Sequence, residues 1–249
     1  MRVERHGQVA LLRLEAGKAN AINAGFLDTL LALFGQLGDA RAAVITGQGS
    51  AFCAGLDLPS LLALDRAGMH AFIARFDEAM TAVARVPVPV IAALNGHAIA
   101  GGTVLALQCD LRLVTDKATA RLGLTETQLG IGLPAIVLES LRAQVPPQSL
   151  APIALEGRLF SPVEALQLGL VHDVIPDAEF LPRALERAAQ LAALPPEGVR
   201  QVKAQLRRPA LEAARAQASA EREFWLDSWL APEPQARLHA AVARLTSKA

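Results

Sequence analysis

Short apolar runs of strand character alternate with helical patterns along most of this chain. Strands are expected at residues 9–14, 42–46, 88–94 and 111–114, and helices at residues 26–37, 61–86 and 102–107. Parallel strands need a long crossover between them, and that crossover is usually a helix. The alternation therefore predicts an α/β fold with a parallel sheet.

The strand signals stop at about Pro176, and the rest of the sequence has helical character. A helix is expected over residues 177–194, where the Pro195-Pro196 pair ends it. We therefore expect a core of residues 1–193 followed by a helical region of residues 194–249.

Both tryptophans of the chain lie in that helical region, at Trp225 and Trp229. A spacing of four puts them on one face of a helix. Two interpretations are open: the pair packs against the core, or it lies in a subunit interface, where aromatic residues are enriched.

The charge balance excludes several classes of partner. Lys and Arg number 24, Asp and Glu also number 24, and 52% of the residues are hydrophobic. A chain without net charge has no general attraction for nucleic acid or for an anionic membrane surface. Its apolar content favours a packed core over disorder. We expect neither nucleic-acid nor membrane partners.

One uncharged stretch, residues 86–107, is long enough to be mistaken for a membrane span. It contains Pro87, Pro89, Asn95-Gly96 and Gly101-Gly102, which are typical of turns and element ends. The stretch is therefore expected to form a strand, a turn and a helix within the core.

The two cysteines, Cys53 and Cys109, are too few for a disulfide framework, and no CxxC motif suggests zinc. We expect both to be small buried residues. The N-terminus carries no apolar segment typical of a signal peptide, because Arg13 and Glu15 interrupt its first apolar run. These features predict a cytoplasmic protein.

Common motifs for metal, nucleotide-phosphate and serine-hydrolase chemistry are missing. The Gly47-Gln48-Gly49 turn has Phe52 where a dinucleotide fingerprint needs its third glycine. The sequence contains no GxxxxGK[ST], HExxH or GxSxG motif, and its five histidines do not cluster. No metal site is predicted.

Two glycine-bearing turns remain as candidates for chemistry, at residues 50–58 and 95–103. Each follows a predicted strand and precedes a helix, where the first N–H groups lack partners within the helix and the macrodipole is positive. Two such groups directed at one point would stabilise an oxyanion. Considered singly, each segment is better interpreted as a tight turn between packed elements.

The order of motifs along the chain resembles the enoyl-CoA hydratase/isomerase (crotonase) superfamily. The matching segments are Lys18-Ala19-Asn20-Ala21-Ile22, AFCAGLDL at 51–58, NGHAIAGG at 95–102, Cys109-Asp110-Leu111-Arg112, residues 123–131 and residues 164–171. The resemblance implies a spiral of ββα turns with a helical tail for trimer assembly, often as a dimer of trimers. It also implies an acyl-CoA thioester ligand, with coenzyme A as part of the substrate and no separate cofactor.

The resemblance also implies roles for particular residues. The oxyanion donors would be the backbone N–H groups of Leu56 and Gly101, with Ala100 standing where the family commonly has glycine. The coenzyme would contact Lys18 through its phosphates and would lie along the turn formed by Ala54, Leu56, Asp57 and Leu58.

A basic residue that is common in the family near this turn is replaced by Pro59. Arg200, Lys203 and Arg207, which share one helical face, could supply phosphate contacts in its place. A solvated helix face is the other interpretation of this cluster.

The resemblance implies two glutamates in the hydratases, and this chain has Val104 in place of one and Glu126 in place of the other. One carboxylate suffices to move a proton from C2 to C4 of a 3-enoyl thioester, whereas positioning a water usually needs a second acceptor. Val104 would keep the site dry and raise the pKa of Glu126.

The pattern therefore favours a Δ3-Δ2 enoyl-CoA isomerase. A hydratase working with Glu126 alone is the alternative, followed by a decarboxylase, a thioester hydrolase and a catalytically silent acyl-CoA-binding protein. Five other carboxylates could also reach the acyl pocket: Asp57, Asp65, Asp77, Glu78 and Glu139. His97 is expected to be a hydrogen-bonded core residue.

Overall fold

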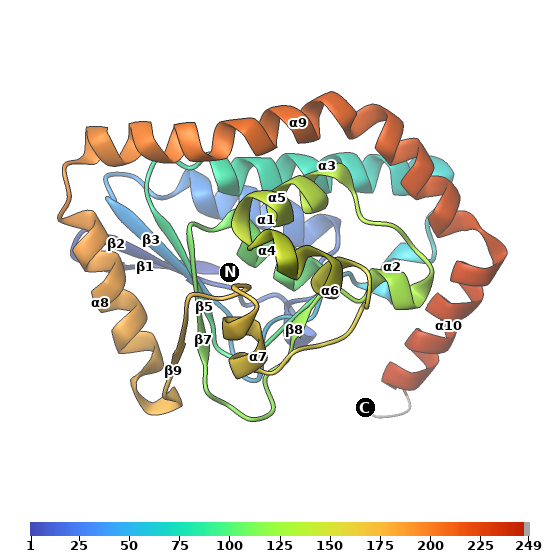
Figure 1. The fold of residues 1–249 in the computed structure, drawn as a ribbon, viewed down its shortest axis with the longest axis horizontal. Helices are drawn as coiled ribbons and strands as arrows, with labels where there is room; N and C mark the ends of the chain where they lie inside the picture. The colour runs from blue at the N-terminus through green and yellow to red at the C-terminus, as the bar shows by residue number, and fades with distance from the viewer. Residues whose placement is uncertain (247–249) are drawn as a thin grey trace.

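The computed structural model describes residues 1–246, and its core repeats a unit of long strand, short strand and helix (Figure 1). The strands are β1 (Arg2–His6), β2 (Val9–Arg13), β3 (Ala42–Thr46), β4 (Ala51–Cys53), β5 (Val90–Leu94), β6 (His97–Ile99), β7 (Leu111–Thr115), β8 (Leu122–Gly123) and β9 (Asp173–Ile175). The core helices are α1 (Ala24–Gly35), α2 (Leu58–Leu61), α3 (Arg66–Arg85), α4 (Gly101–Gln108), α5 (Ala135–Gln144), α6 (Leu150–Ala154), α7 (Pro162–Gln167) and α8 (Phe180–Ala192). Four short 3₁₀ turns accompany them: η1 (Lys18–Asn20), η2 (Glu126–Leu129), η3 (Pro147–Ser149) and η4 (Asp177–Glu179).

The strands form two sheets, one from the long strands and one from the short ones. The larger sheet has the order β1-β2-β3-β5-β7-β9 and is parallel except for the β1–β2 hairpin. The smaller sheet has the order β4-β6-β8 and is parallel throughout. Each short strand follows a long one and precedes a helix, so the expected ββα spiral is confirmed.

The long strands bury both of their faces, which explains their continuous apolar character. Along β2, Ala10 and Leu12 face the main core under α1, α3, α4 and α5, whereas Val9 and Leu11 face the opposite side. On that opposite side, α8 covers the sheet with Phe180 and small alanines (Figure 1). The sheet is thus a buried layer between helices.

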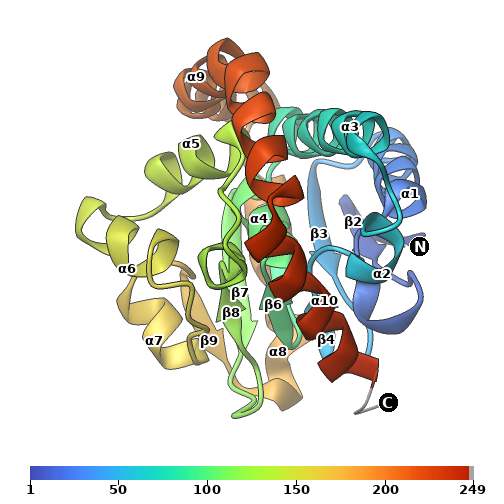
Figure 2. The ribbon, with the colours of Figure 1, turned by 90° about the vertical axis from the view of Figure 1, so that its right-hand side faces the viewer.

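Two long helices follow the core: α9 (Pro196–Leu230) and α10 (Pro232–Thr246). α9 runs along α3 and α5 on top of the core, and α10 then turns down beside α2 and η2 (Figures 1 and 2). The predicted break at Pro195-Pro196 is confirmed, because Pro196 begins α9. The domain division at residues 193 and 194 and the assembly into trimers stay predictions.

Several predicted boundaries differ from the structure. The helix expected over residues 61–86 is two helices, α2 and α3, and the second begins after Asp65, whose carboxylate accepts a hydrogen bond from the Gly68 N–H. β1, β9 and the short strands β4, β6 and β8 were not predicted. β1 is a largely exposed edge strand, and strands of two or three residues are too short to show a period. Within the described residues, no helix is long and apolar enough to cross a membrane.

Candidate active site

The two glycine-bearing turns lie side by side at one end of the smaller sheet. β4 and β6 are parallel neighbours, so the chain leaves both strands in the same direction. The turns touch: a Cβ atom placed on Gly55 would lie 3.4 Å from the Gly101 amide nitrogen, and one placed on Gly101 would lie 3.5 Å from the Gly55 Cα. The structure therefore brings together the backbone groups of Leu56 and Gly101.

Both amide groups are available to a ligand. Gly101 is the first residue of α4, where an N–H has no partner within its own helix. Within the described residues, neither the Leu56 N–H nor the Gly101 N–H donates to a backbone carbonyl. Two unpaired donors from adjacent turns are the arrangement that an oxyanion requires.

Ala100 adopts a backbone conformation that is unusual for a residue with a side chain. Its φ is 50° and its ψ is −117°, outside the regions that L-residues favour. This conformation turns the chain from β6 into α4 and explains physically why glycine suits the position. The departure noted in the sequence is thus a strained alanine directly before Gly101.

Glu126 is a buried carboxyl group without a partner for one of its oxygens. It begins η2, is 9% exposed, and its Oε2 atom has no hydrogen-bond partner within the described residues. Burial raises the pKa of Glu126 to about 7, although the N–H groups of Glu126 and Thr125 partly oppose this shift. A carboxyl group with this pKa can both accept and return a proton near neutral pH.

An apolar cavity of about 20 Å³ joins these groups. It is lined by Leu56, Ile73, Phe76, Gly101, Val104, Glu126, Ile131, Pro134, Val137 and Trp225. Glu126 is the one ionisable residue in this lining, and Val104 lies on α4 within a turn of Gly101. Larger hollows exist elsewhere, including one of about 470 Å³ between α3 and α9, but this cavity is lined by Leu56, Gly101 and Glu126 together.

The walls of the cavity include residues that the sequence did not identify. Ile73 and Phe76 come from α3, and Trp225 comes from α9. The Trp225 Nε1 donates to the Gly132 carbonyl at 2.9 Å, and the indole stacks on Trp229 with ring centroids 5.2 Å apart. Of the two interpretations of the tryptophans, packing against the core is the one that the structure bears out.

The other candidate carboxylates do not line this cavity, and each has a partner elsewhere. Asp57 accepts from Asn23, Asp65 from the Gly68 N–H, Asp77 from Arg222, Glu78 from Arg75 and Glu139 from Arg142. Within the lining of this cavity, Glu126 is therefore the one carboxyl group, and a contact of the other five with a bound acyl chain stays a prediction.

The expected coenzyme side of the site is only partly described. Asp57 accepts a hydrogen bond from the Asn23 side chain at 3.0 Å, and this links the first turn to the start of α1. Pro59 lies in the first turn of α2. Lys18 lies in η1, and its side chain is outside the described part of the chain, so its expected contact with phosphate stays a prediction.

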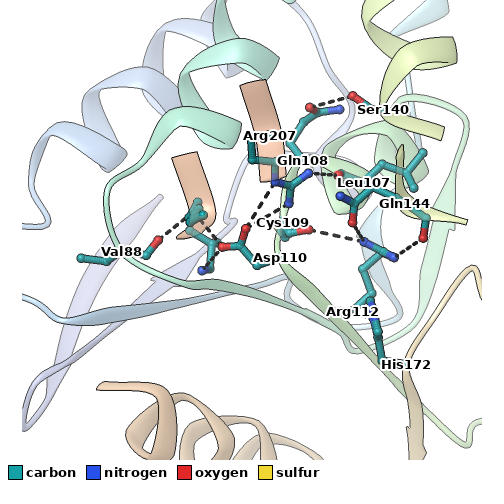
Figure 3. A network of polar contacts seen from close by, with 12 residues as sticks. Val88, Leu107, Gln108, Cys109, Asp110, Arg112, Ser140, Gln144, His172 and Arg207 are labelled. Atoms are coloured by element: carbon teal, nitrogen blue, oxygen red, sulfur yellow. Dashed lines mark hydrogen bonds and ion pairs between the residues drawn. The ribbon is translucent and has the colours of Figure 1, made fainter. Parts of the chain in front are cut away.

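Both interpretations of the basic cluster on α9 are wrong for Lys203 and Arg207, which are buried ion-pair partners of Asp110. Figure 3 shows the pair of Arg207 and Asp110. Lys203 Nζ lies 2.7 Å from Asp110 Oδ2, and Arg207 Nη2 lies 3.1 Å from Asp110 Oδ1. Further bonds to the Val88 and Leu107 carbonyls complete the network. These cations anchor α9 to the sheet and are engaged inside the molecule.

The remaining candidates take no part in the cavity. Burial raises the pKa of the Cys53 and Cys109 thiols to about 12, which makes both unreactive, as expected. His97 is half-buried on β6, but its Nδ1 has no partner within the described residues, contrary to the expected hydrogen bond. The described residues contain no group of His, Cys, Asp or Glu side chains that could hold a metal ion.

Sequence comparison defines the class of protein. The profile of the enoyl-CoA hydratase/isomerase family matches residues 4–229, so the chain belongs to this family. The resemblance seen in the motifs is confirmed, and the spiral of ββα units is the fold of that family's solved structures.

Individual relatives carry both hydratase and isomerase names. A putative enoyl-CoA hydratase/isomerase from Bacillus subtilis is 34% identical over 204 residues, which cover 80% of this chain and 78% of that protein. The human mitochondrial enoyl-CoA delta isomerase 1 is 29% identical over 204 residues, 80% of this chain and 68% of that protein. The crystal structure of human mitochondrial Δ3-Δ2-enoyl-CoA isomerase superposes with a TM-score of 0.94 at 27% identity, covering 99% of this chain and 98% of that chain.

Proposed function

We propose that this protein is a Δ3-Δ2 enoyl-CoA isomerase that uses Glu126 as its single acid–base group. The observation that carries the proposal is a buried carboxyl group with one unpaired oxygen, in the lining of an apolar cavity that also includes Leu56 and Gly101. The likeness to the human isomerase over nearly the whole chain supports the same activity.

The thioester carbonyl oxygen accepts hydrogen bonds from the N–H groups of Leu56 and Gly101. Loss of the C2 proton converts that carbonyl into a dienolate oxygen with negative charge. Two fixed donors in an apolar site stabilise this charge, each by about 3 kcal/mol of barrier.

Glu126 then moves one proton between two carbon atoms of the acyl chain. Its carboxylate removes a proton from C2, and the electron pair of the C2–H bond spreads over the dienolate. The same carboxylic acid returns that proton to C4, and the double bond moves from C3=C4 to C2=C3. The carboxyl group ends in its starting state, which suits a pKa of about 7.

A hydratase acting through Glu126 alone is the second candidate, because the matching family includes hydratases. Hydration needs a water that is held and deprotonated next to C3. The groups around Glu126 are aliphatic or aromatic, with Val104 on the nearby helix, and none of these side chains accepts a hydrogen bond from water. The absence of a second acceptor in this lining favours isomerisation.

Coenzyme A binds in this proposal as part of the substrate, with no separate cofactor. Its adenine end lies along Ala54, Leu56, Asp57 and Leu58, and its phosphates meet Lys18. We propose a homotrimer or a dimer of trimers as the assembly, acting in the cytoplasm.

Product analysis with two substrates tests the function. The purified protein is incubated with a 3-enoyl-CoA and, separately, with a 2-enoyl-CoA, beside a Glu126→Gln variant. Conversion of the 3-enoyl substrate to the conjugated thioester by the wild type alone is the expected result. Water addition to the 2-enoyl substrate as the main reaction would indicate the hydratase, and no turnover of either would indicate a silent acyl-CoA binder.

A further inference from the structure

Ile22 hydrogen-bonds the Leu56 turn through its backbone, and its side chain lies beside Gly101. We propose that Ile22 is a positioning residue that sets the directions of the two oxyanion donors relative to each other. The proposal rests on the proposed function, which assigns those donors. It concerns a residue that takes no part in the proton transfer.

The backbone of Ile22 determines which way the Leu56 N–H points. The Ile22 N–H donates to the Gly55 carbonyl at 2.8 Å, and the Ile22 carbonyl accepts from the Asp57 N–H at 2.9 Å. In a parallel bridge of this kind, the central residue of the partner strand has its own N–H and carbonyl on the opposite edge. Leu56 therefore directs its N–H away from Ile22, toward the side on which β6 and Gly101 lie.

The side chain of Ile22 determines how Gly101 sits. A Cβ atom placed on Gly101 would lie 2.9 Å from the Ile22 Cδ1, and the next contact would be an ordinary 3.5 Å to Gly55. The tip of Ile22 thus occupies the space beside the Gly101 Cα at the start of α4. Ile22 is fully buried, so it cannot move away into solvent.

The segment before Ile22 is clamped to β4, so that Ile22 itself is held in place. Ala19 and Asn20 both have positive φ, 57° and 55°, in the left-handed region. The Asn20 side chain donates to the Phe52 carbonyl at 3.0 Å and accepts from the Ala16 N–H at 2.8 Å. The Ala54 N–H donates to the Ala19 carbonyl at 3.0 Å. This strained turn, held by three hydrogen bonds, therefore fixes the position of Ile22.

Ile22→Val removes Cδ1 alone and leaves the backbone bonds in place. Because misplacement by about 1 Å can cost about 10²-fold in rate, we expect a loss of about 10-fold in kcat/KM from a smaller shift. Ile91→Val is the matched control, since Ile91 is equally buried but faces α8 on the other side of the sheet. That control should keep its kcat/KM.

Binding of a substrate analogue separates positioning from general packing. The probes are a 2-enoyl-CoA and the corresponding thioether, which lacks the carbonyl oxygen. Ile22→Val should weaken binding of the thioester about 10-fold relative to the thioether, whereas Ile91→Val should leave the ratio unchanged. Equal weakening of both probes by Ile22→Val would overturn the proposal. This readout needs no turnover, so it still tests Ile22 if the isomerase activity itself is missing.

A double substitution tests the contact with Gly101 directly. Gly101→Ala should lower the melting temperature, because its new Cβ meets the Ile22 Cδ1. Adding Ile22→Val to Gly101→Ala should recover most of that loss, while adding Ile91→Val should recover none. Additive losses in the Ile22→Val/Gly101→Ala pair would contradict the proposed contact.

Discussion

Glu126 is a buried carboxyl group and Asp110 is a partly buried one, and their surroundings are opposite. Asp110 Oδ1 pairs with Arg207, and Asp110 Oδ2 pairs with Lys203 and accepts the Val90 N–H. Glu126 Oε2 has no partner within the described residues and faces aliphatic and aromatic side chains. Asp110 is an ion-pair partner of two cations on α9, whereas the negative charge of Glu126 is poorly stabilised by its surroundings.

Burial acts on both groups, but it is compensated only at Asp110. Removing a charge from water costs several kcal/mol unless partners replace the lost hydration. Two cations and a backbone N–H supply this replacement for Asp110, whereas Glu126 responds to burial with a raised pKa. We therefore expect substitutions at Glu126 to affect activity and substitutions at Asp110 to affect stability.

The largest effect is expected from Glu126→Gln on turnover. Loss of a general acid–base group typically lowers the rate by about 10²–10⁴-fold. The amide has the same shape, so the fold and the binding of substrate should persist. Initial rates of 3-enoyl-CoA conversion measure the effect, and circular dichroism is the control. A Glu126→Gln variant that keeps more than a tenth of the wild-type kcat would show that another group carries the proton.

Asp110→Ala should damage the fold and leave the chemistry intact. The substitution leaves Lys203 and Arg207 as buried cations without their carboxylate, a loss of about 3–5 kcal/mol in unfolding free energy. Denaturant unfolding followed by circular dichroism measures it. Lys203→Met is a milder comparison, because one cation still pairs with Asp110. An Asp110→Ala variant that is as stable as wild type, or a folded Asp110→Ala variant that has lost its activity, would contradict the structural role assigned to Asp110.

The pH dependence of stability sharpens the same contrast. The Glu126 carboxyl has its usual pKa of 4.5 when unfolded and about 7 when folded, so between these values the folded state holds a proton that the unfolded state has lost. Stability from this group therefore falls as the pH rises through that window. Glu126→Gln has no carboxyl group and lacks this loss. Its unfolding free energy relative to wild type should therefore rise between pH 4.5 and pH 7 and stay constant above pH 7. If the difference in unfolding free energy between Glu126→Gln and wild type is the same at pH 5 and at pH 8, the raised pKa of Glu126 is contradicted.

The smallest effect is expected at Ala100, whose strained backbone precedes Gly101. Ala100→Gly relieves the positive φ but makes the unfolded chain more flexible. The net gain should be at most about 1 kcal/mol, or about 2–4 °C in melting temperature. Differential scanning calorimetry measures it. A lower melting temperature for Ala100→Gly would show that the alanine is not strained in solution.

The sequence predicted the strands that form continuous apolar runs, namely β2, β3, β5 and β7. The short strands of the smaller sheet were not predicted, because a segment of two or three residues is too short to show a periodic pattern. Glu126, Leu56, Gly101 and Val104 were all singled out from the motifs, and the structure brings them to one cavity.

The rest depended on contacts between residues far apart in the chain. Arg207 finds its partner Asp110 at a separation of 97 residues, so its helical spacing alone could not distinguish an internal ion pair from a solvated face. The cavity walls Ile73, Phe76 and Trp225 likewise come from helices whose packing no local pattern specifies.

Transfer of label within the substrate tests the single-carboxylate account most directly. A 3-enoyl-CoA carrying deuterium at C2 is converted in ordinary water, and the product is analysed by mass spectrometry and NMR at the earliest turnovers. If Glu126 removes the C2 deuteron and returns it in a cavity with little access for water, deuterium appears at C4 of the conjugated product. A product with only protium at C4 from the first turnover would contradict the account, because a second group or solvent would then supply the proton.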